Sequence, residues 1–328
     1  MMDKAIQDLL NTVNKTHGSK SALLLSDNSI EPLNYISSGS LTLDIALSKT
    51  KGYPCGRMIE IFGAEGVGKT TLAIKAMVSM QNKSDETYVG IVDAEQAFDK
   101  SYAESLGLDS SRVVIAQPDC LEEALAESVE MLKVCKLVVL DSIAGSRPRK
   151  EMEGNIEDQN VALHPNILSR AVGQLIHACK GNESILIALN QIREKPGVMY
   201  GSPINIPGGH FIKHAASVRI ELRPSEEIKS TKDNIRIGHY VKAKIVKNKV
   251  YVPYKEAMIP LIYGLGIIEE LEIANIAVEL GIIKKSGSWY SYNDLKLDQG
   301  LLNVMTFLID NTDIAKELKN LIIEKIAI

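Results

Sequence analysis

The chain has 328 residues, of which 45% are hydrophobic and 24% are charged, and its formal net charge is −4. This length suits two or three domains, and the ordinary charged fraction argues against a wholly disordered chain. No run of 18 apolar residues is present, which excludes a membrane-spanning helix, and the first 20 residues lack the apolar segment of a secretion signal. The mild negative charge, taken alone, disfavours a protein that coats nucleic acid through its overall charge.

Four cysteines lie far apart in the sequence and form no CxxC pair. They are Cys55, Cys120, Cys135 and Cys179. Together with the missing secretion signal, this spacing predicts reduced thiols in a cytoplasmic protein, without a disulfide framework or a zinc site.

The first 34 residues predict a small arm. Apolar residues recur at helical spacing from Ala5 to Val13, Gly18 follows as a stop, and residues 23–25 are typical of a short strand. Elements this small cannot bury their own apolar faces, so we expect the arm to pack on the main domain or on a second copy.

Residues 35–266 alternate short apolar runs with helical stretches, which is typical of a parallel sheet covered on both faces. The predicted strands are 58–62, 89–92, 113–116, 137–140 and 185–189, and the predicted helices are 70–80, 121–134 and 167–179. Hairpin strands are expected at 218–222, 240–246 and 250–252, with a polar turn at 224–234. Residues 267–328 predict a third unit, with helices at 268–280, 301–309 and 314–326 and a short aromatic segment at 288–292. The predicted class is therefore α/β, with a mostly parallel central sheet, an N-terminal helix-strand arm and a small α+β C-terminal domain.

The strongest motif follows the strand at 58–62 and opens the next helix. It consists of Gly63, Ala64, Glu65, Gly66, Val67, Gly68, Lys69, Thr70 and Thr71, and it matches the P-loop pattern G-x-x-x-x-G-K-[ST]. Its glycines let successive N–H groups face one anion, and the helix N-terminus adds positive charge. Lys69 would reach the β- and γ-phosphates of ATP, and the Thr70 hydroxyl would bind Mg²⁺. A glycine-rich turn without a ligand is the weaker alternative.

Polar side chains follow three further apolar strands. Asp141 ends the strand at 137–140 and suits a Walker B role beside Mg²⁺, with a helix cap as the alternative. Glu95 suits activation of the attacking water, with a solvated acid as the alternative. Gln191 suits detection of the γ-phosphate, with an ordinary turn residue as the alternative. Because ligands bind at the carboxyl edge of open α/β sheets, these groups are expected to surround one site.

In this order, the motifs resemble those of the bacterial RecA recombinase family. Segments 36–47, 92–99, 189–201, 208–209, 246–249 and 288–292 also have counterparts there, so the resemblance spans nearly the whole chain. It implies a RecA-type P-loop NTPase core, here 35–266, with a polymerisation arm, 1–34, and a C-terminal domain, 267–328. Pro196 and Gly173 depart from the family pattern near the DNA, as expected of a divergent member such as one encoded by a phage or mobile element.

The resemblance also implies a role for each matching residue. The catalytic residues would be Glu95, Gln191, Lys247 and Lys249. Besides the P-loop, ATP would contact Asp99 and Tyr102, while Tyr263 and Gly264 would lie near a neighbouring subunit's nucleotide. Thr70 and Asp141 would bind Mg²⁺. The two lysines would reach a neighbour's ATP and stabilise transition-state charge, as an arginine finger does. A solvated hairpin turn is the alternative for this lysine pair.

The charge distribution reverses the first impression about nucleic acid. Residues 193–249 hold twelve basic and five acidic residues, a net +7, so the remainder of the chain sums to −11. Such asymmetry suits phosphate-backbone binding. Residues 193–210 and 151–160 resemble the family's two DNA-binding loops, which line a path for single-stranded DNA. The DNA-binding residues implied by the resemblance are Val161, Ser169, Arg193, Lys195, Pro196, Gly197, Gly208, Gly209 and His210.

The expected function is that of an ATP-dependent recombinase with ATP and Mg²⁺ as cofactors. It would form helical filaments with itself on single-stranded DNA, pair with double-stranded DNA and exchange strands, with hydrolysis releasing the filament. A LexA-like repressor is a further expected partner, through co-protease activity in an SOS response. The alternatives are a RecA-fold DNA motor of the helicase kind and a regulatory nucleoprotein scaffold.

Overall fold

The computed structural model of the chain describes residues 3–18, 21–24, 26, 32–153, 163–194, 204–205, 209–231 and 233–327. These residues belong to two units, Met1–Asn34 and Tyr35–Ile328, and each unit is described by itself. No helix in the described ranges is long and apolar enough to cross a membrane.

The first unit contains the helix α1 (Lys4–His17). Asp3 caps it by accepting a hydrogen bond from the Ala5 amide at 3.0 Å, and Gly18 ends it with a φ of 101°. None of its side chains is buried, so the helix has no apolar partner among the described residues of its unit. The strand expected at 23–25 is not found, because Leu23 and Leu24 are irregular; Leu25 lies outside the described residues.

A nine-stranded sheet forms the centre of the second unit, in the order β13-β12-β11-β10-β3-β7-β6-β4-β5. Five of its strands pair only in parallel or form the edge of the parallel part: β3 (Met58–Gly63), β4 (Val89–Asp93), β5 (Val113–Ala116), β6 (Leu137–Asp141) and β7 (Ile185–Gln191); the next strand, β10, is parallel to β3 and antiparallel to β11. These confirm the five predicted strands to within two residues. Two small ribbons complete the core: β1 (Tyr35–Ile36) with β2 (Tyr53–Pro54), and β8 (Arg193–Glu194) with β9 (Ile204–Asn205).

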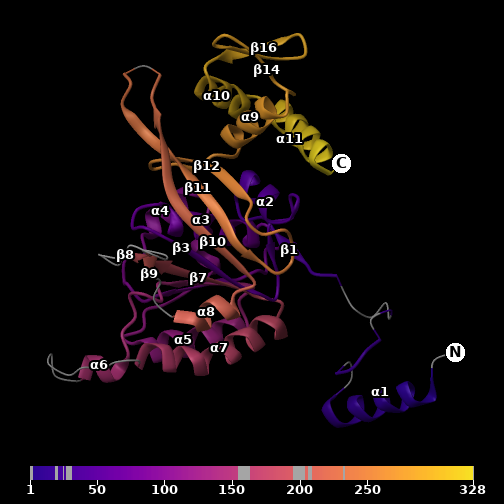
Figure 1. The fold of residues 1–328 in the computed structure, drawn as a ribbon. Helices are drawn as coiled ribbons and strands as arrows, with labels where there is room; N and C mark the ends of the chain where they lie inside the picture. Colours follow the sequence, from indigo (N-terminus) through magenta and orange to yellow (C-terminus); the bar gives the residue numbers. More distant parts are fainter. Residues whose placement is uncertain are drawn as a thin grey trace. The chain divides into compact units, whose positions relative to one another are not determined.

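The antiparallel side of the sheet differs from the prediction. β10 (Val218–Lys229) and β11 (Arg236–Asn248) form a long hairpin that rises out of the sheet in Figure 1. The turn predicted at 224–234 is too long: residues 224–229 belong to β10, and only the residues between Lys229 and Arg236 connect the two strands. Pro224–Glu227 are exposed, which explains their polar character although their backbone is extended. Residues 250–252 form no strand, and the sheet continues instead through β12 (Glu256–Ile262) and β13 (Gly266–Ile267).

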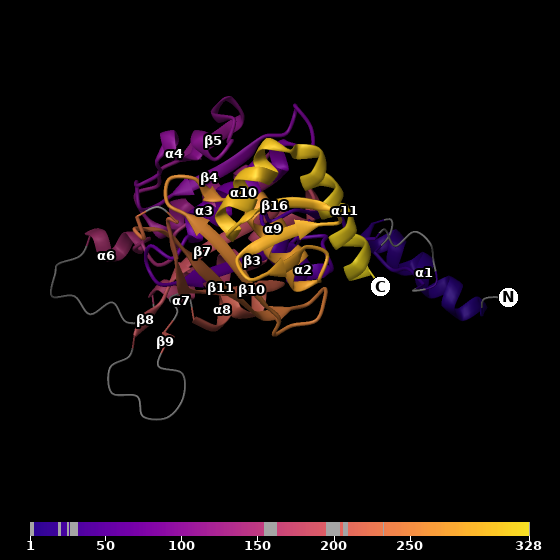
Figure 2. The same cartoon turned by 90° about the horizontal axis from the view of Figure 1, so that it is seen from above.

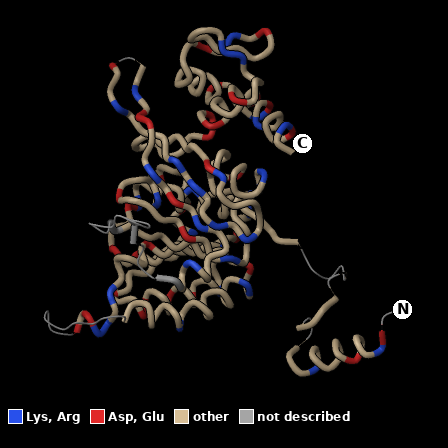
Figure 3. Tube along the Cα trace, in the orientation of Figure 1, with Lys and Arg blue, Asp and Glu red and all other residues tan. Residues whose placement is uncertain are grey.

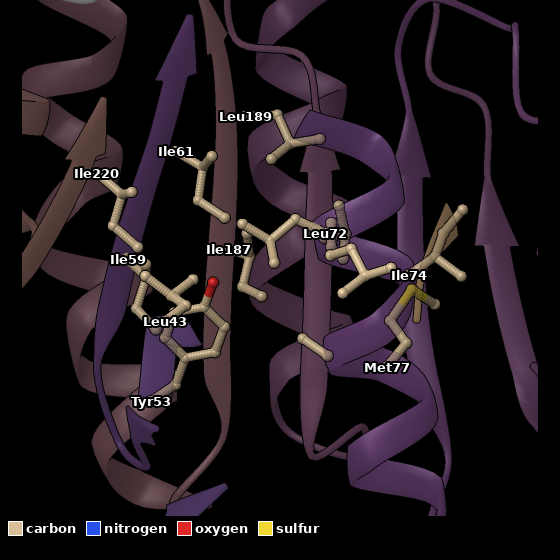
Figure 4. Packing of buried hydrophobic residues seen from close by; sticks show 14 of the residues in the cluster. Leu43, Tyr53, Ile59, Ile61, Leu72, Ile74, Met77, Ile187, Leu189 and Ile220 are labelled. Atoms are coloured by element: carbon tan, nitrogen blue, oxygen red, sulfur yellow. The ribbon is translucent and has the colours of Figure 1, made fainter. Parts of the chain in front are cut away.

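Helices cover both faces of the sheet, as the continuous apolar strands require. The helices α2 (Leu41–Ser48), α3 (Lys69–Gln81) and α4 (Lys100–Ser105) lie on one face, where Ile59 and Ile187 point (Figure 4). The helices α5 (Leu121–Leu132), α7 (Leu163–Gly181) and α8 (Gly209–Ala215) cover the other face (Figure 1). Two short helices, the 3-10 helix η1 (Ser110–Arg112) and α6 (Arg149–Glu153), lie in the connections.

The C-terminal region has its own apolar cluster. It consists of α9 (Glu269–Glu279), β14 (Lys284–Ser286), β15 (Trp289–Tyr292), β16 (Leu295–Gln299), α10 (Leu301–Asp310) and α11 (Thr312–Ala327). Figure 2 shows these helices over the end of the core that carries α2. The arrangement confirms a small α+β region after the sheet.

One buried carboxylate joins this region to the core. Glu272 of α9 is completely buried and accepts hydrogen bonds from the Ser40 hydroxyl and from the Leu41 amide at 2.9 Å. It thereby satisfies free N–H groups at the start of α2. Burial raises the pKa of Glu272 to about 7, while the hydrogen bond from Ser40 and those from 41–42 lower it.

Replacing Glu272 by Ala should lower the free energy of unfolding by about 2–3 kcal/mol, because buried donors at the start of α2 lose their acceptor. Urea unfolding followed by circular dichroism measures this change. Glu279→Ala, on the exposed face of the same helix, is the matched control and should change stability by less than about 0.5 kcal/mol. Equal effects of the two variants would contradict the capping role.

Candidate active site

The loop between β3 and α3 has the geometry of a phosphate cradle. Gly66 and Gly68 have φ angles of 70° and 98°, which turn the backbone between strand and helix. A Cβ on Gly68 would lie 2.6 Å from the Leu261 side chain, so the close approach to β12 also requires glycine. Lys69 Nζ donates to the carbonyl oxygens of Gly63 at 3.3 Å and Ala64 at 2.8 Å, which places the ammonium group inside the loop. Val67 is buried and anchors the loop, whereas Glu65 is exposed.

The register of the parallel strands brings the other predicted groups to the same edge. Gly63 at the end of β3 lies opposite Gln191 at the end of β7, and Asp93 at the end of β4 lies opposite Asp141 at the end of β6. β7 and β6 are neighbours and Leu140 lies opposite Ala188, so all four strands end at one edge of the sheet, with β3 and β7 running two residues further. This is the edge at which open α/β sheets bind ligands.

Thr70 and Asp141 are in direct contact, as the P-loop and Walker B roles require. The Thr70 hydroxyl donates to Oδ2 of Asp141 at 2.9 Å. Burial raises the pKa of Asp141 to about 6, and the negative charges of Glu95 and Asp93 act in the same direction. Burial lowers the pKa of Lys69, against the nearby Asp141, Glu95 and Glu65. A crowded carboxylate beside a hydroxyl is a good environment for a divalent cation.

The donor set fits Mg²⁺ bound together with a nucleotide. Mg²⁺ characteristically takes one or two protein oxygens and completes its shell with water and substrate phosphates. Thr70 and Asp141 supply two such oxygens beside the P-loop. Within the described ranges, no group of three His, Cys, Asp or Glu side chains could hold a metal ion by itself. The triphosphate would therefore be part of the metal site.

Glu95 and Gln191 come from different strands and meet beside the P-loop. Gln191 Nε2 donates to Oε1 of Glu95 at 3.0 Å. The Ser142 hydroxyl donates to the same oxygen. The two residues predicted to activate water and to detect the γ-phosphate are therefore in contact in this structure.

Asp99 and Tyr102 lie beside the P-loop helix. Asp99 caps α4 and accepts a hydrogen bond from the Tyr102 amide at 3.0 Å. The Tyr102 hydroxyl is 2.9 Å from the hydroxyl of Thr71 on α3. The Tyr102 side chain also packs against the main apolar cluster, so it joins the core to the predicted adenine site.

Lys247 and Lys249 lie elsewhere. Both donate to the carbonyl oxygen of His214 at 3.2 Å, and Lys247 donates also to that of Lys213, at the C-terminal end of α8. Burial lowers the pKa of Lys247 to about 8, and the positive charges of Lys249 and Arg219 lower it further, against Glu60. The structure does not bring these lysines into contact with the P-loop of their own chain.

The neighbouring strands connect Lys247 to an ionic group. Arg219 on β10 lies opposite Lys247 on β11 and opposite Glu60 on β3. Its guanidinium group binds the fully buried Glu60, which also accepts a hydrogen bond from Asn190 on β7 at 3.2 Å. Lys247, Arg219, Glu60 and Asn190 thus form a row of polar side chains across four adjacent strands, β11, β10, β3 and β7.

Tyr263 and Gly264 occupy the turn between β12 and β13. Both are exposed, and Gly264 has a φ of 78°. The Tyr263 hydroxyl lies 3.3 Å from Nδ1 of His239, and the Arg236 guanidinium lies 5.7 Å from the centre of its ring. His239 and Arg236 thus contact the tyrosine side chain, which remains about half exposed to solvent.

The predicted DNA-binding residues are only partly described. Arg193 lies in β8, and Gly209 and His210 begin α8. Ser169 lies on α7 and donates to the Asn166 carbonyl at 2.8 Å. Val161, Lys195, Pro196, Gly197 and Gly208 lie outside the described residues. Of the loop expected at 151–160, residues 151–153 belong to α6 and the others lie outside the described residues.

Sequence reasoning counted the basic residues of the hairpin but missed that Arg223, Lys242 and Lys244 share one face with Glu221 and Glu256. Arg223 on β10 lies opposite Lys242 on β11, and Lys244 follows on the same face. Arg223 pairs with Glu221 at 2.7 Å and Lys242 with Glu256 at 2.8 Å, and Figure 3 shows the blue segments along these strands. The alternate spacing of Lys242 and Lys244 was the available signal, because residues two apart share a face of a strand.

Comparisons with known proteins agree with this geometry. The profile of the RecA N-terminal domain matches residues 4–268, and that of the RecA C-terminal domain matches residues 271–327. The chain is 42% identical over 323 residues to Protein RecA of Bacteroides thetaiotaomicron, which covers 98% of this chain and 96% of the relative. It is 41% identical over 325 residues to Protein RecA of Porphyromonas gingivalis, covering 98% and 94%. It is also 41% identical over 320 residues to Protein RecA of Streptococcus parasanguinis, covering 96% and 83%.

These matches extend from α1 to the end of α11 and include the P-loop, the strand ends that surround it and the C-terminal region. The chain belongs to the RecA family of DNA-dependent ATPases and recombinases.

Proposed function

We propose that this protein forms filaments on single-stranded DNA in the presence of ATP and Mg²⁺ and uses them for homologous pairing and strand exchange. The observation that carries the proposal is the meeting of Lys69, Thr70, Asp141, Glu95 and Gln191 at one sheet edge. The predicted DNA-binding segment 193–210 follows Gln191 in the chain. The end of β7 therefore connects the nucleotide site to the segment that is predicted to bind DNA.

Hydrolysis would proceed by attack of water on the γ-phosphate. The P-loop amides and Lys69 would bind the phosphates, and Thr70 and Asp141 would hold Mg²⁺, which neutralises phosphate charge when bound. Glu95 would accept a proton as the water oxygen bonds to the γ-phosphorus and the bond to the bridging oxygen breaks. The products are ADP and inorganic phosphate.

Gln191 is suited to report the state of the nucleotide. Its amide is engaged with Glu95 in this structure, and a γ-phosphate would offer it a charged acceptor instead. β8 follows Gln191 in the chain after one residue. A movement of the Gln191 side chain would therefore shift β8 and the predicted DNA-binding segment that begins there. The contact thus supports hydrolysis that depends on DNA.

Filament formation is supported by an unprotected sheet edge. β5 is the last strand of the nine-stranded sheet, and its Val114 and Ile115 side chains are 44% and 48% exposed. Exposed apolar edge strands favour pairing with another chain. Likewise, no side chain of α1 is buried among the described residues of its unit. A second copy would therefore supply an apolar partner for α1 and a pairing partner for the β5 edge. Lys247 and Lys249 would then reach the neighbour's ATP, and Tyr263 and Gly264 its base.

The domain boundaries, the contact with duplex DNA and the further partner are inferred from the charge of the residues and from membership of the RecA family. We infer an arm at 1–34, an ATPase core at 35–266 and a C-terminal domain at 267–328. Arg223, Lys242 and Lys244 would contact the phosphates of duplex DNA, in exchange for the pairs that Arg223 and Lys242 make with Glu221 and Glu256. We also infer a LexA-like repressor as a partner of the filament, and the free thiols of all four cysteines suit the cytoplasm.

Assays of ATP hydrolysis, strand exchange and duplex unwinding test this function together. Single-stranded DNA should raise the hydrolysis rate at least tenfold, with strand exchange and without unwinding.

Two substitutions test the assignments within the nucleotide site. Lys69→Ala should abolish nucleotide-dependent filaments, because the phosphates lose their main cation. Glu95→Gln should bind ATP and form filaments but hydrolyse ATP roughly 100-fold more slowly. Unwinding without strand exchange would overturn the proposal, and normal hydrolysis by Glu95→Gln would refute the catalytic assignment.

The pH dependence of assembly tests the trans role of Lys247. Its pKa of about 8 means that the side chain is charged below pH 8 and loses its charge as pH rises through that value. The protein concentration needed for half-maximal DNA-stimulated ATPase should therefore rise between pH 7 and pH 9. Lys247→Arg should reduce this rise, because arginine stays charged, and Lys296→Arg in the C-terminal region is the control. Identical profiles for wild type and Lys247→Arg would count against the assignment.

A charge on the β5 edge should prevent assembly. Ile115→Lys places an ammonium group on the exposed edge, where it would have to be desolvated against a second copy. We expect no regular filaments on single-stranded DNA in electron micrographs, while ATP binding by the monomer is retained. Leu295→Lys, at a similarly exposed apolar position on β16, is the control and should form filaments. Normal filaments from Ile115→Lys would exclude this edge from the interface.

A further inference from the structure

Ser142 directly follows Asp141 at the end of β6, and its side chain is fully buried. Its hydroxyl donates to Oε1 of Glu95, and the amide of Gly145 donates to Ser142 Oγ at 3.1 Å. Because an amide can only donate and a carboxylate can only accept, the hydroxyl hydrogen is directed at Glu95. The direction of the hydrogen bond between Ser142 and Glu95 is thereby determined by the backbone around it.

The carboxylate of Glu95 is held on one side only. Oε1 accepts from both Ser142 and Gln191, whereas Oε2 accepts no hydrogen bond from the described part of the chain. Gly145 also borders the same side chain, because a Cβ there would lie 2.8 Å from Cγ and 3.1 Å from Oε1 of Glu95. The turn 142–145 therefore fits closely around the carboxylate and leaves one of its oxygens open.

A general base needs such an arrangement. The last torsion of a glutamate side chain has a broad energy minimum, so an unrestrained carboxylate rotates and presents either oxygen in many directions. A hydrogen bond to one oxygen restricts that rotation. Catalysis by proton transfer depends on holding the accepting oxygen within hydrogen-bonding reach of the water.

We propose that Ser142 is a positioning residue for ATP hydrolysis: its hydroxyl holds Oε1 of Glu95 and so presents Oε2 to the attacking water. The proposal rests on the catalytic role proposed for Glu95. It also separates Ser142 from Gln191. When Gln191 turns to the γ-phosphate, Oε1 loses one donor, and Ser142 keeps the carboxylate in place.

Ser142→Ala tests this role, with Ser146→Ala as a matched control. Ser146 is also buried in the same turn, but its hydroxyl donates to the Ser142 carbonyl at 3.1 Å and not to Glu95. In DNA-stimulated ATP hydrolysis, Ser142→Ala should lower kcat roughly tenfold and leave KM for ATP within about twofold. Ser146→Ala should change kcat by less than about twofold. A normal kcat for Ser142→Ala, or equal losses in the two variants, would overturn the proposal.

A double-mutant cycle distinguishes positioning of Glu95 from a general structural role. In single-turnover hydrolysis, Ser142→Ala should have no further effect in a Glu95→Gln background, and an undiminished tenfold loss there would overturn the proposal. If Glu95→Gln alone hydrolyses normally, the catalytic assignment fails; if only Ser142→Ala is normal, the positioning role alone fails.

Should Ser142→Ala not fold, Gly145→Ala serves instead, because its methyl group would displace Glu95. Gly145→Ala should lower kcat with ATP binding retained, and a normal kcat would overturn the proposal.

Discussion

The site depends on the register of four parallel strands. β3, β7, β6 and β4 end at the same edge of the sheet, within two residues of one another, so a glycine loop, an amide and carboxylates from distant parts of the sequence come together. Apolar side chains on both faces maintain that register, because a slip of one residue would turn each strand's buried side chains to the opposite face. The chemistry of the site is therefore a consequence of how the core packs.

A second row of polar side chains lies within this frame. Asn190, Glu60, Arg219 and Lys247 come from four adjacent strands, and each is paired with or lies opposite the next. The row begins beside Gln191 and ends at the lysine that we assign to the neighbour's ATP. Buried ionic groups of this kind are costly to break and so keep a fixed geometry. The sheet is thus suited to hold its own nucleotide at one edge and to offer cations to a neighbour at another place.

The sequence was sufficient for the parallel half of the fold, because continuous apolar runs between helices leave few alternatives. The prediction of strands failed where a strand is exposed to solvent or contains a proline, because neither feature is typical of a strand in a sheet. Pro224–Glu227 look like a turn because the projecting hairpin is solvated, and Pro260 interrupts the apolar run of β12. The motif residues of the site were predictable from local spacing. Ser142 was not, because its role arises from a contact with Glu95, 47 residues away in the sequence.

We propose that Gln191, which donates to Glu95, connects DNA binding to ATP hydrolysis. The most direct measurement is the ratio of single-turnover ATP hydrolysis rates with and without single-stranded DNA, compared between the wild type and Gln191→Ala. Glu95, Lys69 and Asp141 all remain in that variant, so we expect a ratio close to one, with basal hydrolysis retained. If Gln191→Ala kept the stimulation of the wild type, Gln191 would not be the connection, because DNA would then act on Glu95 by another route.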